Sequence, residues 1–173
     1  MRIILVSKAA GGKDFFRDFI KKKLDVDISY STRPPREGEI DNETYNFITS
    51  NEYWDMENNN AFFESVQFNG WHYGTSRNSW ENKDVFIMTP SGVKQIPKRD
   101  RKDCVVVFFD IPIDIRKLRL DNRSDADRVE RRLRADEKDF KYFKDFDIRV
   151  RNPLFSPEVV YNLIKAYEYA DRS

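Results

Sequence analysis

The chain has 173 residues, of which 31 are basic and 30 acidic, so its net charge is +1. This length fits a single domain with a real core, and the balanced charge excludes the broad cationic surface of a nonspecific nucleic-acid binder. One cysteine, Cys104, lies in an apolar run and excludes an internal disulfide framework. The first apolar run is too short for a signal peptide or membrane span, so we expect a cytoplasmic protein without membrane partners.

The chain begins with a pattern of strand, glycine loop and helix. Residues 2–6 are Ile-rich and predict a buried strand, and residues 14–23 predict an amphipathic helix. The helix periodicity places four residues inward: Phe15, Phe16, Phe19 and Ile20. The run between the two elements is SKAAGGK, and this arrangement is the one that a phosphate-binding loop requires.

This loop departs from the pattern G-x-x-x-x-G-K-[ST] at both ends, since Ser7 takes the first glycine position and Asp14 follows the lysine. Backbone amides at the helix N-terminus can still hold the phosphates of ATP, and a lysine can reach β and γ oxygens. The residues concerned are Ala10, Gly11, Gly12 and Lys13. A carboxylate at Asp14 is a hard ligand suited to Mg²⁺. An ordinary Gly-Gly turn capped by Asp14 remains the alternative.

The most informative block is SYSTRPPREGEIDNETYNF, from Ser29 to Phe47. Arg33 and Arg36 stand three residues apart around two prolines, which fix φ and reduce the entropy that a phosphate clamp loses. Each guanidinium can bind two phosphate oxygens at once. Two phosphate sites in one chain indicate a donor and an acceptor, hence phosphoryl transfer. The alternative is a pair of solvated surface arginines.

Further elements alternate between strand and helix. We expect strands at 27–30, 45–48, 62–67, 71–74, 84–89, 103–110 and 146–150. Helices are expected at 50–58, briefly from Pro90, and at 112–122, 126–145 and 156–170. This alternation predicts an α/β protein with a parallel three-layer sheet.

The block at 29–47 resembles the nucleotide-binding region of guanylate kinases, whose run is S-x-TTR-x-PR-x-GE-x-x-G-x-x-Y-x-F. The similarity continues at three further places and then weakly at a fourth: FE at 63–64, GWHYGT at 70–75, SGV at 91–93 and RRL at 131–133. The resemblance implies a P-loop kinase that uses ATP and Mg²⁺ to phosphorylate a nucleoside monophosphate, with GMP or dGMP preferred. It also implies three parts of a single domain: a core (1–30, 84–118, 146–173), an inserted monophosphate-binding subdomain (31–83) and a short lid (119–145).

The resemblance implies roles for the acceptor-side residues. Those expected to hold the acceptor phosphate are Arg33, Arg36, Tyr45 and Tyr73, and those expected to read guanine are Ser29, Glu64 and Thr75. The chemistry agrees, because a carboxylate at Glu64 can accept from guanine N1–H and its amino group, while Thr75 can donate to O6.

The sequence departs from the family on the strand before Gly92. Guanylate kinases usually carry two acids there, where this chain has Ile87 and Thr89. Without an acid at Thr89, the sequence predicts a weaker selectivity for guanine. The loss of these acids also leaves Asp14 as the expected ligand of the metal ion.

On the lid side, the resemblance assigns Arg119, Arg123 and Arg132 to the transferring phosphoryl group, with Arg128, Arg131 and Arg134 as competing candidates and a solvated helix face as the alternative. Asn152 is expected near the adenine, and His72, the only histidine, is expected to be structural.

Two other functions stay open. The first is a deoxynucleoside monophosphate kinase with broader or shifted base choice, favoured by Gly12-Lys13-Asp14 and Thr89. The second is a binding module without catalysis, which Lys13 and the two clamp arginines argue against. The sequence leaves the oligomeric state undetermined.

Overall fold

The computed structural model describes residues 1–121 and 129–171, apart from the side chains of residues 131, 132 and 171. Its central sheet has four strands in the order β6-β1-β7-β8, and every neighbouring pair is parallel. The strands are β1 (Arg2–Ser7), β6 (Val85–Ile87), β7 (Cys104–Phe109) and β8 (Ile148–Val150). All six residues of β7 are buried, including Cys104 as expected, because helices cover both faces of the sheet.

Two helical layers enclose the central sheet. One face packs against α1 (Lys13–Ile20) and α8 (Pro157–Asp171) through side chains such as Phe16, Phe109 and Ile164. The other face packs against α3 (Arg77–Asn82), α4 (Pro90–Val93) and α7 (Val129–Phe140). The predicted three-layer α/β fold is therefore confirmed.

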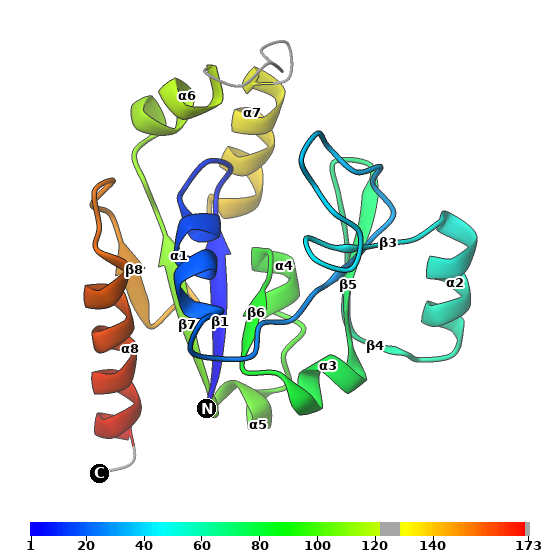
Figure 1. The fold of residues 1–173 in the computed structure, drawn as a ribbon, viewed down its shortest axis with the longest axis horizontal. Coiled ribbons are helices and arrows are strands. Elements are labelled where there is room, and N and C mark those ends of the chain that lie inside the picture. The colour runs from blue at the N-terminus through cyan, green and yellow to red at the C-terminus, as the bar shows by residue number, and fades with distance from the viewer. Residues whose placement is uncertain (122–128, 172–173) are drawn as a thin grey trace.

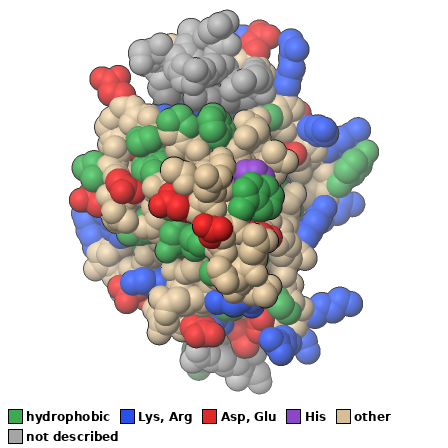
Figure 2. Space-filling model, turned by 90° about the vertical axis from the view of Figure 1, so that its right-hand side faces the viewer, with side chains coloured by type: hydrophobic (Ala, Val, Ile, Leu, Met, Phe, Trp, Pro, Cys, Tyr) green, Lys and Arg blue, Asp and Glu red, His purple; other side chains and the backbone are tan. Residues whose placement is uncertain are grey.

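A second four-stranded sheet lies beside the first, next to β6, with α2 (Ser50–Asn58) on its outer side (Figure 1). Its order is β3-β2-β5-β4, from the strands β2 (Tyr30–Ser31), β3 (Asn46–Phe47), β4 (Phe62–Phe68) and β5 (Trp71–Ser76). Asn69 and Gly70 form the tight turn between β4 and β5 with φ of 53° and 82°. Figure 2 views this outer side, where hydrophobic side chains form small groups among charged ones.

Two more helices lie at opposite ends of the central strands, one of them beside α7. α6 (Ile113–Asp121) and α7 lie together beyond the carboxyl end of β1, and α5 (Lys98–Arg101) lies near the opposite end (Figure 1). Within the described ranges, no helix combines the length and apolar character that crossing a membrane would need. His72 stacks on Tyr53 with ring centroids 4.6 Å apart, which fits its expected structural role.

Several predicted elements need correction. Phe15 is 60% exposed rather than inward, because it lies at the side of α1 and meets Phe155 edge-on. The strand expected at 27–30 is Tyr30–Ser31 instead, since Asp27 N still bonds to Val85 O of the central sheet before the chain crosses over.

The long charged helix ends at Phe140, five residues earlier than expected, and its predicted start lies outside the described residues. The chain turns there because Phe143 and Phe146 pack against Phe108, with ring centroids 5.3 and 5.4 Å away. The short helices α3 and α5 were not predicted at all.

Candidate active site

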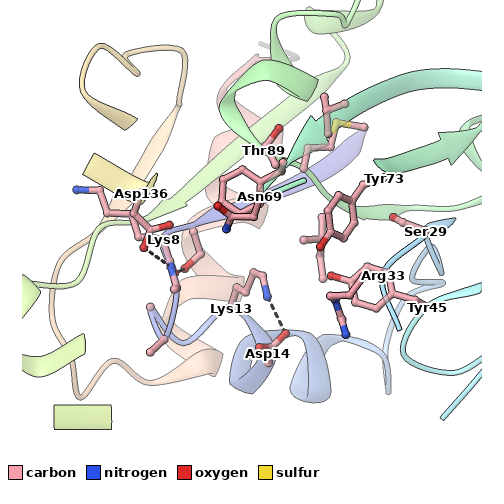
Figure 3. Close-up of a pocket in the computed structure, with 18 of the residues that line it drawn as sticks. Lys8, Lys13, Asp14, Ser29, Arg33, Tyr45, Asn69, Tyr73, Thr89 and Asp136 are labelled. Carbon is pink, nitrogen blue, oxygen red and sulfur yellow. Dashed lines mark hydrogen bonds and ion pairs between the residues drawn. The ribbon is translucent and has the colours of Figure 1, made fainter. Parts of the chain in front are cut away.

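A cavity of about 210 Å³ opens where the loop between β1 and α1 faces the second sheet. Figure 3 shows Lys8 and Lys13 on one side of it, Arg33, Tyr45 and Tyr73 on the other, and Thr89 between the two groups. The residues expected to bind the donor and the acceptor therefore line one continuous space.

The glycine loop takes a conformation that few other residues could adopt. Gly12 has φ of 93° at the N-terminal cap of α1, and Ala10 has φ of 56°. A side chain at Gly11 would collide with the Ser7 hydroxyl and lie 3.1 Å from Phe109 O. The substituted first position is thus occupied by a small residue whose hydroxyl donates to Lys8 O at 2.8 Å. The loop keeps the close backbone approach that phosphate binding needs.

Lys13 and Asp14 pair at the start of α1, with Nζ 2.9 Å from Oδ1, and Arg17 lies 3.5 Å from the same oxygen. Burial alone would lower the pKa of Lys13, but the Asp14 carboxylate and the Tyr45 hydroxyl raise it above 10.5. Lys13 is therefore a permanent cation at the cavity wall, and it lies within electrostatic reach of the acceptor side.

The residues present fit a magnesium ion that enters with its nucleotide. Among the described residues, no group of three or more His, Cys, Asp or Glu side chains could hold an ion unaided. Mg²⁺ commonly takes only one or two carboxylates and completes its shell with phosphate oxygens and water. Asp14 lines the cavity beside the loop and supplies such a carboxylate.

A buried ion pair holds the glycine loop from behind. Asp136 of α7 accepts from Ala9 N at 2.9 Å and from Arg116 of α6 at 2.9 Å, and the two side chains are 5% and 1% exposed. Arg116 also donates to Ala9 O at 3.3 Å and to Ile111 O at 3.1 Å. Because both ends of the pair bond to Ala9, the loop and two helices form one hydrogen-bonded unit.

Arg119 also contacts the loop. It donates to Ala10 O at 3.0 Å and to Pro153 O at 2.8 Å. Lys8 lies 3.5 Å from Asp110 and 3.7 Å from Glu137. Both cations thus lie beside the backbone that would hold the donor phosphates, Arg119 through a carbonyl rather than through an open guanidinium.

On the acceptor side, Arg33 is 7% exposed and forms a two-point ion pair with Glu39, with distances of 2.7 and 2.9 Å. Its guanidinium lies 5.3 Å from the ring centroid of Tyr45. Glu39 also accepts from Arg36 N at 2.7 Å. The guanidinium of Arg33 therefore already binds the carboxylate of Glu39. A phosphate could bind the same two N–H groups in its place.

Two tyrosines complete this side. The rings of Tyr45 and Tyr73 meet edge-on with centroids 6.0 Å apart. Burial raises the pKa of Tyr73, and the Tyr45 hydroxyl adds to the rise, so Tyr73 remains a neutral donor near Arg33. Arg36 is exposed on the loop and lines the cavity.

The base side contains two buried carboxylates. Glu64 is 5% exposed and accepts from Thr75 Oγ1 at 2.9 Å, while Asp27 is 7% exposed and accepts from Ser29 Oγ at 2.7 Å. Burial raises the pKa of Glu64 to about 7; the Thr75 hydroxyl opposes the rise and Asp27 adds to it. Ser29 and Glu64 line the cavity, and Thr75 lies behind Glu64.

The remaining predicted residues have mixed positions. Thr89 lines the cavity and accepts from Gly92 N at 3.1 Å as the cap of α4, and Ile87 lines it nearby. Asn152 is exposed and accepts from Leu154 N at 2.9 Å in the loop after β8. Arg134 is 83% exposed and pairs with Glu130 at 3.3 Å. Arg123, Arg128 and the side chains of Arg131 and Arg132 lie outside the described residues.

Sequence reasoning missed Asp27, Glu39, Arg116 and Asp136. Glu39 stands in the run R-x-GE, so its position beside the clamp could have been considered from the resemblance. Arg116 and Asp136 carry no local signal, because their partners lie on other elements far along the chain.

Comparisons with known proteins identify the family of this chain. The family model described as guanylate kinase matches residues 2–165. Guanylate kinase from Bartonella henselae is 31% identical over 180 residues, covering 97% of this chain and 80% of that protein. The enzyme from Shewanella denitrificans is 28% identical over 165 residues, covering 88% and 79%.

The crystal structure of guanylate kinase from Anaplasma phagocytophilum has the same fold, with a TM-score of 0.74 at 18% identity over 99% of this chain and 85% of that one. Family model, relatives and fold lead to one conclusion: the chain belongs to the guanylate kinase family.

Proposed function

We propose that this protein is a guanylate kinase that transfers the γ-phosphoryl group of ATP to GMP or dGMP. The observation that carries the proposal is a single cavity that Lys13 lines from the glycine loop, Arg33 and Tyr45 from the acceptor side, and Glu64 from the second sheet. Such a cavity can hold a donor and an acceptor phosphate face to face. Positioning of this kind supplies most of the catalysis in phosphoryl transfer.

On the donor side, the backbone amides from Ala10 to Lys13 bind the β-phosphate, aided by the N-terminus of α1. Lys13 neutralises charge on the transferring group, since its amino group stays protonated. Asp14 would hold Mg²⁺ together with phosphate oxygens and water. When bound, the ion neutralises charge on the phosphates.

On the acceptor side, the phosphate of GMP displaces Glu39 from the guanidinium of Arg33, and Arg36 and the hydroxyls of Tyr45 and Tyr73 complete its shell. An oxygen of that phosphate then attacks the γ-phosphorus while ADP leaves. The exchange at Arg33 conserves a two-point ion pair, so the buried guanidinium is never left unpaired.

At the base, the ionised Glu64 accepts from N1–H and the 2-amino group of guanine. These two donors are adjacent on the edge of the base, so one carboxylate can accept from both. A pyrimidine without this pair of donors would leave the buried carboxylate unmatched, which discriminates against it.

We assign the lid functions to 119–145, the acceptor subdomain to 31–83 and the core to the remainder. Arg119, Arg123 and Arg132 stay the candidates that reach the transferring group, and Asn152 the one near the adenine. A cytoplasmic location suits both substrates.

A second candidate function rests on one observation. The positions where the family carries acids are Ile87 and Thr89, and the Thr89 hydroxyl already caps α4. Loss of a guanine contact there favours a kinase that also accepts other deoxynucleoside monophosphates.

One assay tests these candidates. ADP release from ATP and Mg²⁺ is measured with GMP, dGMP, dAMP, dTMP and dCMP. The proposal predicts the highest kcat/KM for GMP or dGMP. A preference for a pyrimidine would replace it with the broader kinase, and binding of GMP without ADP release would indicate a binding module.

A further inference from the structure

Behind the base side of the cavity lies a carboxylate that the proposed mechanism does not use. Asp27 is 7% exposed, and its backbone N–H bonds to Val85 O at 2.8 Å, which fixes it against the central sheet. Ser29 lines the cavity, and Asp27 meets it through the hydrogen bond of 2.7 Å between Ser29 Oγ and Asp27 Oδ2. Asp27 therefore reaches a ligand through Ser29.

This hydrogen bond runs from the Ser29 hydroxyl to the Asp27 carboxyl. Burial raises the pKa of Asp27, and the Ser29 and Ser79 hydroxyls and the Lys83 charge oppose part of that rise. Ser79 lies close enough to Asp27 to lower its pKa. Even so, Asp27 Oδ1 has no partner at hydrogen-bonding geometry among the described residues. Because Ser29 Oγ donates to Asp27 Oδ2 in this arrangement, its single proton points to Asp27 and away from the cavity.

The other hydroxyl of this subsite is used in the same way. Thr75 Oγ1 donates to Glu64 Oε1 at 2.9 Å, so its proton also serves a buried carboxylate. Thr89 Oγ1 accepts from Gly92 N. In this arrangement Ser29 presents only lone pairs to a base, and the proton of Thr75, behind Glu64, is already used.

We propose that Asp27 is a specificity-determining positioning residue, which takes the proton of Ser29 and so makes the subsite select purines by their N–H groups without reading the oxygen at position 6. The inference rests on the proposed function, because it requires a purine monophosphate in this subsite. It adds a selectivity rule: donors on the base are matched, whereas the carbonyl receives no proton from Ser29 or Thr75.

GMP and 6-thio-GMP test this rule, since they differ only at position 6 and sulfur is the weaker acceptor. The measured quantity is the ratio of kcat/KM for GMP to that for 6-thio-GMP, in which general losses of activity cancel. Asp27→Ala frees the Ser29 proton to donate to the oxygen. The ratio should therefore rise by roughly twofold to tenfold, the effect of one neutral hydrogen bond.

Two further variants separate positioning from a structural role. Ser29→Ala should leave the ratio unchanged in the wild-type background, whatever it does to turnover, and should abolish the rise in the Asp27→Ala background. Asp84→Ala removes an exposed acid near the same strand end and serves as the matched control, with the wild-type ratio expected.

The proposal is overturned if Asp27→Ala turns over GMP with an unchanged ratio, or if its rise persists without the Ser29 hydroxyl. Should Asp27→Ala fail to fold, Ser29→Ala decides alone, because a lowered ratio in that variant means that Ser29 already donates to the base. Failure of the proposed function is seen separately, as wild-type protein that does not phosphorylate GMP.

Discussion

Replacing Glu64 by Gln should make the protein more stable at alkaline pH while impairing its use of guanine. Folding raises the pKa of this carboxyl from 4.5 to about 7 because the side chain is buried. The folded state therefore favours the protonated acid, and stability is lost as the pH rises from about 4.5 to about 7. The shift of about 2.5 units corresponds to roughly 3 kcal/mol above pH 7.

The pH dependence of the variant is the sharper quantity, since an unpaired amide at position 64 would add a cost that does not change with pH. Between pH 5 and pH 8 the ionisation penalty grows by about 2.5 kcal/mol in the wild type and is absent in Glu64→Gln. Urea unfolding of both proteins at the two pH values measures this difference directly. The variant should gain that amount relative to the wild type.

Glu39→Gln provides a matched control of opposite sign. Burial would raise the pKa of Glu39, but its bonds to Arg33 and Arg36 N lower it overall. Stability from Glu39 is therefore present above about pH 4.5 and lost in acid. Glu39→Gln should lose stability relative to the wild type as the pH rises through the acid range to about 4.5, and its difference from the wild type should hardly change between pH 5 and pH 8. If the stability difference between wild type and Glu64→Gln is the same at pH 5 and pH 8, the reasoning about Glu64 is wrong.

The same carboxyl should govern catalysis. If ionised Glu64 receives the guanine donors, kcat/KM for GMP should rise about tenfold from pH 6 to pH 8, as the ionised fraction grows around a pKa of about 7. Titration of the GMP phosphate affects kcat/KM in the wild type and in Glu64→Gln alike. The part of the pH-dependent rise that is absent from Glu64→Gln is therefore due to Glu64.

Three further substitutions test other parts of the site. Lys13→Ala should lower kcat about 10²-fold, the effect of losing an electrostatic stabiliser; wild-type turnover in a folded variant would contradict the phosphate-loop assignment. Arg36→Ala should weaken all monophosphate acceptors alike in titrations, and loss of ATP affinity alone would contradict the clamp. Thr89→Asp keeps a cap for α4 and should raise the ratio of kcat/KM for dGMP to dAMP; an unchanged ratio would show that this position does not face the base.

How far the sequence predicts this molecule depends on how local each interaction is. The strand at 2–7 and the helix after it follow from apolar periodicity and a glycine loop, both of which are readable within a few residues. The inward position predicted for Phe15 is wrong because its contact, Phe155, lies far along the chain and leaves no local pattern. The helices at 77–82 and 98–101 were missed since they are only six and four residues long, too short for a periodic pattern.

The site divides in the same way. The clamp residues and Glu64 stand in motifs that the resemblance makes recognisable, and the structure places Arg33 and Glu64 along one cavity. The direction of the Ser29 hydroxyl depends instead on Asp27, which is buried and fixed beside Ser29 by its backbone bond to Val85 O of the central sheet. No linear pattern reports such burial, so a sequence can name the hydroxyls of a subsite without showing where their protons point.

The ion pair between Arg116 and Asp136 limits how this sequence can evolve. Losing either partner would leave a buried charge uncompensated, at a cost of about 3–5 kcal/mol, and would also remove a bond to Ala9. Exchanging both for apolar residues of similar volume is far less harmful. Related sequences should therefore keep both residues or replace both. Positions 116 and 136 should change together although they lie twenty residues apart in the chain.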